Sequence, residues 1–137
     1  MTGKTIVHGR EIMVVDDDAF IVGLLTDVLT SWGFSVTAFT SSHEAFNRFV
    51  YSPDDFDLLI TDQMMPGLTG VELCRGVQRI RAGFPVVLCT GYSHGVNERN
   101  YREFGLSHYL TKPINHMGLQ AVIECELGEV MSVDHAC

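Results

Sequence analysis

The sequence predicts an α/β fold in which a doubly wound, five-stranded parallel sheet is covered by helices on both faces. Five short apolar segments alternate along the chain with longer stretches in which apolar residues recur at helical spacing. Most of these segments are continuously apolar, which is typical of parallel strands that are buried on both faces. Right-handed crossovers between successive strands then favour the doubly wound arrangement.

Each expected strand stops where polar or small residues begin, and this change marks its carboxyl end. The second segment alternates between apolar and polar residues and is rich in β-forming side chains, whereas the first and fourth are continuously apolar. The five strands are predicted over residues 12–15, 34–39, 58–60, 86–89 and 106–110.

Local signals mark the ends of the first three expected helices. Asp18 is a suitable N-cap for the first helix, and Gly33 is a suitable stop after it. Residues 41–44 and 69–72 both have the pattern of a capping box, in which a hydroxyl residue is followed three positions later by glutamate. These two boxes predict where the second and third helices begin.

The last two helices are predicted with different strength. The segment 95–104 should form the weakest of the five, because Gly95, Asn97 and Asn100 all disfavour a helix. The final helix is expected from about residue 115 to residue 130, where apolar residues return at helical spacing.

The length of the chain fits one folded domain. A chain of 137 residues has the usual size of a single domain, and we expect this domain over residues 10–130. The segments 1–9 and 131–137 are expected to be loosely ordered ends.

Composition excludes several classes of protein. The net charge is −8 and lysine and arginine are scattered singly, so the chain lacks the basic surface of a nucleic-acid binder. The N-terminal residues lack the apolar core of a signal peptide, and no apolar run approaches the ~18 residues of a membrane span. We therefore predict no membrane contact, a cytoplasmic location and, without a CxxC pair, reduced cysteines.

The residues that carry the chemistry follow the predicted strands. Asp16 and Asp17 follow the first strand, Asp62 the third, Thr90 the fourth and Lys112 the fifth. In an open α/β sheet, ligands bind beyond the carboxyl ends of the strands, at the point where the strand order reverses. With strand order 2-1-3-4-5 this point lies between strands one and three, so the three aspartates should converge there.

Three converging carboxylates repel one another, and a hard cation removes this conflict. Mg²⁺ is the expected ion, because it prefers oxygen ligands and keeps some of its water.

Simpler explanations exist for each of these residues. The aspartates could be turn and capping residues, Thr90 an ordinary strand threonine, Lys112 a solvated lysine and Tyr109 a packing residue.

Four segments together resemble the receiver domains of bacterial response regulators. Residues 12–18 are similar to the opening strand and acidic pair of that family, and residues 62–70 to its phosphoacceptor loop with Met-Pro and glycine. Residues 86–91 resemble its fourth strand with a switch threonine, and residues 109–113 its fifth strand with an aromatic residue, lysine and proline. The likeness spans about residues 10–127 and implies a flavodoxin-like (βα)5 fold.

The resemblance implies a role for each acidic residue. Asp62 would be the nucleophile that takes a phosphoryl group from a phosphohistidine and forms an acyl phosphate. Asp17 and Asp62 would bind Mg²⁺ directly together with the backbone carbonyl of Met64, and Asp16 would bind it through water. Such a domain would not be an enzyme beyond its own phosphorylation and dephosphorylation.

The resemblance also implies the residues around the phosphoryl group. Lys112 and the hydroxyl of Thr90 would contact phosphoryl oxygens, and Gly91 would leave room beside them. Tyr109 would be the switch aromatic that turns inward on phosphorylation. The bond between Lys112 and Pro113 is expected to be cis.

Partners follow from the same resemblance. A sensor histidine kinase or a phosphotransfer protein would supply the phosphoryl group, and the downstream partner would be a protein that recognises residues 95–104, the fifth strand and the last helix. Homodimer formation on phosphorylation is left open. A DNA-binding output domain would need about 60 more residues, so we expect a stand-alone receiver or an excised module. Residues 88–93 are similar to C-terminal receivers of hybrid sensor histidine kinases.

Two other functions share some of these sequence features. A Mg²⁺-dependent phosphohydrolase of haloacid-dehalogenase type would also use an aspartyl phosphate, but its nucleophile stands on the first strand in a D-x-D motif. Here Asp62 follows the third strand and Met64 occupies the second acidic position. A receiver-like docking module that takes no phosphoryl group should lack the acidic pair, the acceptor or the lysine, and all are present.

Overall fold

The computed structural model describes residues 10–91 and 95–128, and the expected loose ends lie outside these ranges. Five parallel strands form one sheet in the order β2-β1-β3-β4-β5, which confirms the predicted topology. The strands are β1 (Glu11–Val15), β2 (Ser35–Phe39), β3 (Leu58–Thr61), β4 (Val86–Thr90) and β5 (His108–Thr111).

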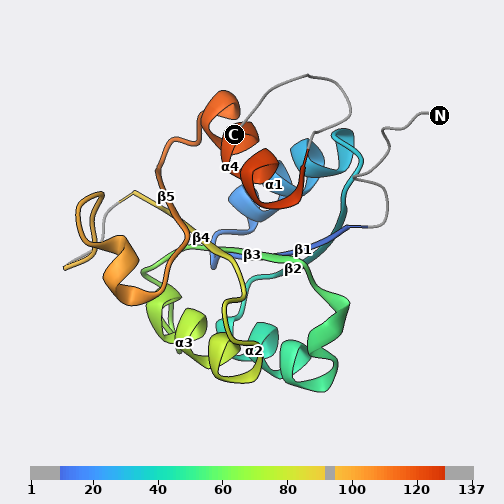
Figure 1. Ribbon diagram of the computed structural model, residues 1–137. Helices are drawn as coiled ribbons and strands as arrows, with labels where there is room; N and C mark the ends of the chain where they lie inside the picture. Colours follow the sequence, from blue (N-terminus) through green and yellow to red (C-terminus); the bar gives the residue numbers. More distant parts are fainter. Residues whose placement is uncertain (1–9, 92–94, 129–137) are drawn as a thin grey trace.

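Helices cover both faces of this sheet. Within the described ranges the α-helices are α1 (Ala19–Ser31), α2 (Ser42–Tyr51), α3 (Gly70–Ile80) and α4 (His116–Leu127). Two short 3₁₀ helices join them, η2 (Pro53–Asp55) and η3 (Tyr101–Phe104). Figure 1 shows α1 and α4 on one face of the sheet and α2 and α3 on the other.

The connection between β4 and β5 differs from the prediction. An α-helix was expected over residues 95–104, but the described part of this segment consists of turns followed by η3. The side chain of Asn97 accepts the backbone N–H groups of Arg99 and Asn100, and Asn100 donates its side-chain amide to the carbonyl of Gly95. These local bonds compete with a helical ladder, and the prediction of an α-helix there is wrong.

Side chains cap the helices where the sequence predicts. Asp18 accepts the N–H of Phe20 at the start of α1, at 2.9 Å. Thr69 and Glu72 form a complete capping box at the start of α3. Asn115 caps α4, which begins one residue later than expected.

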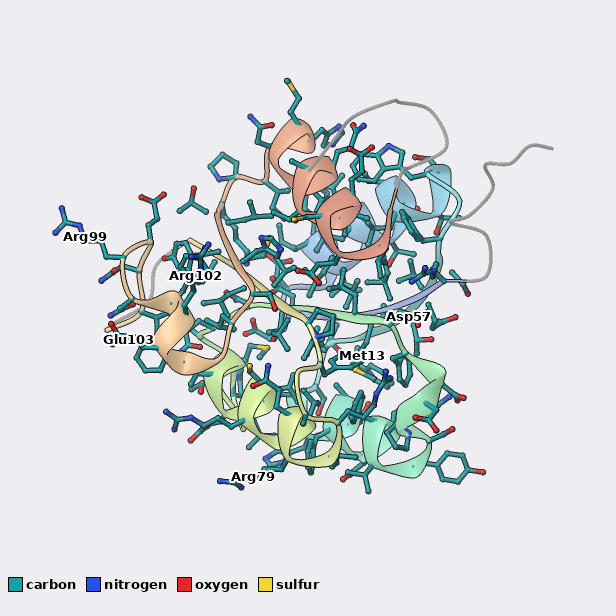
Figure 2. The ribbon with its side chains drawn as sticks, viewed as in Figure 1. Met13, Asp57, Arg79, Arg99, Arg102 and Glu103 are labelled. Carbon is teal, nitrogen blue, oxygen red and sulfur yellow. The ribbon has the colours of Figure 1, made fainter. Side chains whose placement is uncertain are left out.

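The core has two parts that are separated by the sheet. Ile12 and Val14 of β1 pack with α1 and α4, whereas Met13 and Val15 pack with α2 and α3. Figure 2 shows Met13 on the α2 and α3 side of the strand. Every residue of β3 and β4 is buried, as expected for inner strands of a sheet that is covered on both faces.

The cysteines agree with the prediction only in part. Cys74 and Cys89 are buried and free, and burial raises their pKa values to about 11 and about 12. Cys125 is exposed and disulfide-bonded, so the expectation of reduced thiols is wrong for this residue.

Among the described helices, none combines the length and the apolar character that a membrane span requires.

The loop between β3 and α3 is held by the start of α2. The hydroxyl of Ser42 is buried, donates to the carbonyl of Pro66 at 3.1 Å and accepts the N–H of Leu68 at 2.8 Å. Gly67 between them has φ +84°, and a Cβ atom there would lie 2.7 Å from the ring of His43. This loop is therefore fixed by α2 as well as by its own ends.

Candidate functional site

Three carboxylates meet at the carboxyl edge of the sheet. Asp16 and Asp62 directly follow Val15 of β1 and Thr61 of β3, which face each other in the paired strands. One carboxylate oxygen from each of Asp16, Asp17 and Asp62 lies within 4.8 Å of the others. The predicted convergence of the three aspartates is thus found in the structure.

The ammonium group of Lys112 lies among these carboxylates. Its Nζ is 2.7 Å from Oδ2 of Asp16 and 3.4 Å from Oδ2 of Asp62. The backbone N–H of Lys112 donates to the carbonyl of Thr90, which ties the lysine to the end of β4. The Lys112–Pro113 peptide bond is cis, as the sequence resemblance implies.

Burial and charge act in opposite directions at the pair formed by Asp16 and Lys112. Burial raises the pKa of Asp16, although hydrogen bonds from Lys112 and from the N–H of Asp18 oppose this change. Burial lowers the pKa of Lys112, but the hydrogen bond to Asp16 and the charges of Asp16 and Asp62 outweigh burial and raise it. Lys112 therefore remains a cation at neutral pH.

The donor set fits a divalent metal ion. Three carboxylates and one ammonium group leave two negative charges in the cluster when all are ionised. The donors are carboxylate oxygens, which suit Mg²⁺, and exposed Asp17 gives an ion access from solvent. Met64 lies in the loop directly after Asp62 and is half exposed, so its carbonyl belongs to the same loop as the acidic cluster.

Both carboxylate oxygens of Asp62 have a partner. The residue is 8% exposed, its Oδ1 accepts the N–H of Gln63 at 2.8 Å, and its Oδ2 faces Lys112. The hydrogen bond fixes the orientation of the carboxylate, and the lysine stabilises negative charge on that side.

The other predicted residues lie on or directly after β4 and β5. Thr90 is buried at the end of β4, opposite Thr111 of β5, and Gly91 follows it at the surface. Tyr109 lies two residues before Thr111, is half-buried, and places its ring 6.1 Å from that of Tyr101. The ring of Tyr109 therefore lies beside η3, in the segment between β4 and β5.

A cavity of about 480 Å³ borders this aromatic residue. Figure 2 shows Arg99, one of its lining residues, extending away from the sheet. The cavity is lined by Asn97, Glu98, Arg99, Tyr109 and Thr111.

Two residues in the acceptor loop were not assigned a role from the sequence. Gln63 is buried, and its side-chain oxygen accepts the N–H of Val71 at 2.9 Å. Gly70 packs so tightly that a Cβ atom there would lie 2.3 Å from the carbonyl oxygen of Asp62. A polar amide directly after a buried strand was a visible signal, but the sequence does not show which group it contacts.

The family of response regulator receiver domains matches the chain over residues 12–124, and the chain belongs to this family. It is a receiver domain of the type found in two-component signalling systems. This assignment, together with an acidic cluster built from β1 and β3, does not favour a haloacid-dehalogenase-type phosphohydrolase or a docking module without an acceptor.

Curated relatives contain the domain as part of a longer chain. The DNA-binding response regulator MtrA of Mycobacterium tuberculosis is 32% identical over 118 residues, which are 86% of this chain and 50% of MtrA. The transcriptional regulatory protein ZraR of Escherichia coli is 29% identical over 124 residues, 90% of this chain and 28% of ZraR. The chain thus spans between about a quarter and a half of these relatives.

Solved structures of a response regulator and of a receiver domain protein have a similar fold. The response regulator TrrA of Thermotoga maritima, in complex with Mg²⁺ and beryllofluoride, superposes with a TM-score of 0.76 at 27% identity, covering 86% of this chain and 99% of TrrA. A receiver domain protein of Clostridium thermocellum gives 0.75 at 29% identity, covering 80% and 87%. These similarities agree with the family and the fold.

Substitution of Gly70 by alanine should test how tightly α3 is packed against the acceptor strand. The new Cβ would meet the backbone oxygen of Asp62 and the side chain of Leu88, and overpacking of this kind costs about 1–3 kcal/mol. Urea unfolding at equilibrium measures the loss. Gly91→Ala is the control, because among the described residues its Cβ would meet only Cβ of Lys112, at 3.8 Å. Equal losses in both variants would contradict the packing argument.

Proposed function

We propose that Asp62 of this receiver domain accepts a phosphoryl group in a Mg²⁺-dependent reaction. The donor is the phosphohistidine of a sensor histidine kinase or of a phosphotransfer protein. The observation that carries the proposal is the convergence of Asp16, Asp17 and Asp62 at the carboxyl edge of the sheet, where Lys112 contacts Asp16 and Asp62. The domain promotes only its own phosphorylation and dephosphorylation. The proposed location is the cytoplasm, as expected for a protein that receives the phosphoryl group from these donors.

The side chains at the edge of the sheet suggest how the reaction proceeds. A carboxylate oxygen of Asp62 attacks the phosphorus atom, the new O–P bond gives an acyl phosphate, and the P–N bond breaks with its electron pair returning to the histidine of the donor. The ammonium group of Lys112 stabilises the charge on the phosphoryl oxygens, and the hydroxyl of Thr90 donates to one of them. Gly91 leaves room beside the group.

A bound Mg²⁺ supplies charge neutralisation at the oxygens of the transferred group. Asp17, Asp62 and the carbonyl of Met64 would hold the ion directly, and Asp16 through water. The two negative charges left by three carboxylates and Lys112 support this set. The TrrA structure, which contains Mg²⁺ and beryllofluoride, gives a precedent in a receiver with the same fold.

Phosphorylation of Asp62 is proposed to change the surface around β5. Thr90 moves toward the phosphoryl group, Tyr109 turns inward, and the segment 95–104 rearranges, so that a downstream protein partner or a second copy binds. Side-chain bonds of Asn97 and Asn100 hold the first part of this segment, and most of its residues are exposed apart from buried Val96. Such segments open at low free-energy cost, which favours a shift between two packings.

Incubation with acetyl phosphate and Mg²⁺ should add the mass of one phosphoryl group to the wild-type protein. Asp62→Asn should prevent the addition, because the amide is not a nucleophile for phosphorus. Intact mass spectrometry measures both. Asp54→Asn, an exposed aspartate in η2, is the matched control and should label normally; labelling of the Asp62→Asn variant would refute the assignment.

Added Mg²⁺ should stabilise the folded protein through the acidic cluster. A ligand at 100 times its Kd raises the free energy of unfolding by about 2.7 kcal/mol. Asp17→Ala should abolish both this stabilisation and the phosphorylation, whereas Asp27→Ala, which removes an exposed charge from α1, should preserve both. Urea unfolding with and without Mg²⁺ provides the measurement. An unchanged Mg²⁺ response in Asp17→Ala would show that the ion binds elsewhere.

Beryllofluoride, a mimic of the phosphoryl group, should change hydrogen exchange over residues 95–110 as well as around Asp62. Thr90→Ala should remove the distant change, because its hydroxyl links the phosphoryl group to β4 and to the segment that follows. Thr111→Ala, on the neighbouring strand and exposed, should retain it. A distant change that persists in Thr90→Ala would rule out this coupling.

A further inference from the structure

Gln63 places a buried amide between the acceptor strand and the start of α3. It directly follows Asp62 and is 7% exposed. A buried amide is retained at little cost only when its polar atoms are hydrogen-bonded. The side-chain oxygen of Gln63 meets this requirement in a way that connects two parts of the proposed site.

One side of this residue contacts the acceptor itself. The backbone N–H of Gln63 donates to Oδ1 of Asp62 at 2.8 Å. Oδ2 of the same carboxylate then faces the ammonium group of Lys112 at 3.4 Å. The peptide group between residues 62 and 63 therefore sets the direction in which the carboxylate is presented.

The other side of Gln63 contacts α3. Its side-chain oxygen accepts the N–H of Val71 at 2.9 Å, and its backbone carbonyl accepts the N–H of Gly70 at 3.0 Å. The first N–H groups of a helix have no partner within the helix. Gln63 satisfies two of them, while Thr69 satisfies the N–H of Glu72.

We infer that Gln63 is a positioning residue for phosphoryl transfer to Asp62. Its side chain fixes the 62–63 peptide group against α3, and the N–H of that peptide group fixes the acceptor carboxylate. The inference rests on the proposed function. An apolar side chain of similar size could fill the same space but would leave the N–H of Val71 without its acceptor. The peptide group would then be held less firmly, by the bond from the Thr61 hydroxyl to the carbonyl of Asp62 and by the bond from Gly70 to the carbonyl of Gln63.

The expected effect is on the rate of phosphoryl transfer. Small errors in the position of a reacting group lower rates strongly, because the reacting atoms spend less time at attack distance. Asp62 is also a proposed ligand of Mg²⁺, so a change in its orientation alters the Mg²⁺ affinity as well. The rates are therefore compared at saturating Mg²⁺, where the rate of phosphorylation should still fall.

Three variants separate positioning from general stability. Gln63→Leu keeps the volume and removes the acceptor, and Gln63→Glu restores an acceptor oxygen that is favoured near a helix N-terminus. Thr69→Ala is the matched control, because it removes another cap of the same helix without a bond to the 62–63 peptide group. If Gln63→Leu fails to fold, Gln63→Met, which is unbranched, takes its place.

The measurement is the initial rate of phosphoryl incorporation from acetyl phosphate at a series of Mg²⁺ concentrations that reaches saturation, scaled to the folded fraction. We expect Gln63→Leu to be slower by about tenfold, Gln63→Glu to recover most of the rate, and Thr69→Ala to react like the wild type. An unchanged rate in Gln63→Leu, or an equal loss in Thr69→Ala, would overturn the inference. A folded wild type that takes no phosphoryl group would instead refute the proposed function.

Discussion

Three carboxylates that repel one another meet at the carboxyl edge of the sheet, and the ammonium group of Lys112 lies among them. The pairing of β1 with β3 brings Asp16 and Asp62 together, because they directly follow Val15 and Thr61, which are paired across the two strands. Burial raises the pKa of Asp16, so the ionised cluster costs free energy unless cations balance it. Lys112 balances part of this charge. The charge that remains is the physical basis of the divalent-ion site proposed at this edge.

Much of this arrangement could be predicted from the sequence, because it depends on signals that act over short distances. A continuous apolar run such as 86–89 has few structural interpretations, because such runs alternate along this chain with segments of helical pattern. The polar residue after each run then marks a carboxyl end, and a parallel sheet gathers such ends at one edge. Asp18 and Thr69 cap helices through groups only two or three residues away. These features needed no knowledge of tertiary contacts.

The features that were missed depend on which groups approach each other in three dimensions. Helix propensity gave a weak helix over residues 95–104, but it did not include the mutual hydrogen bonds by which Asn97 and Asn100 close turns instead. The role of Gln63 depends on the position of Val71, eight residues away, which is set by the packing of α3. Likewise, the contact of Gly70 with the carbonyl of Asp62 appears only when helix and strand are both in place.

The loop after β3 and the segment after β4 are held by different kinds of contact. The loop after β3 is bonded by Ser42 from α2 and by Gln63 to α3, mostly through buried groups. The described part of the segment after β4, residues 95–104, is held by the side chains of Asn97 and Asn100, by backbone hydrogen bonds around η3 and by packing of Val96 and Tyr101 against the core. Under the proposed function, a phosphoryl group on Asp62 would lie next to the loop that α2 and α3 hold. The proposed rearrangement is assigned to residues 95–104 because more of their side chains are exposed, so that fewer buried contacts would have to change.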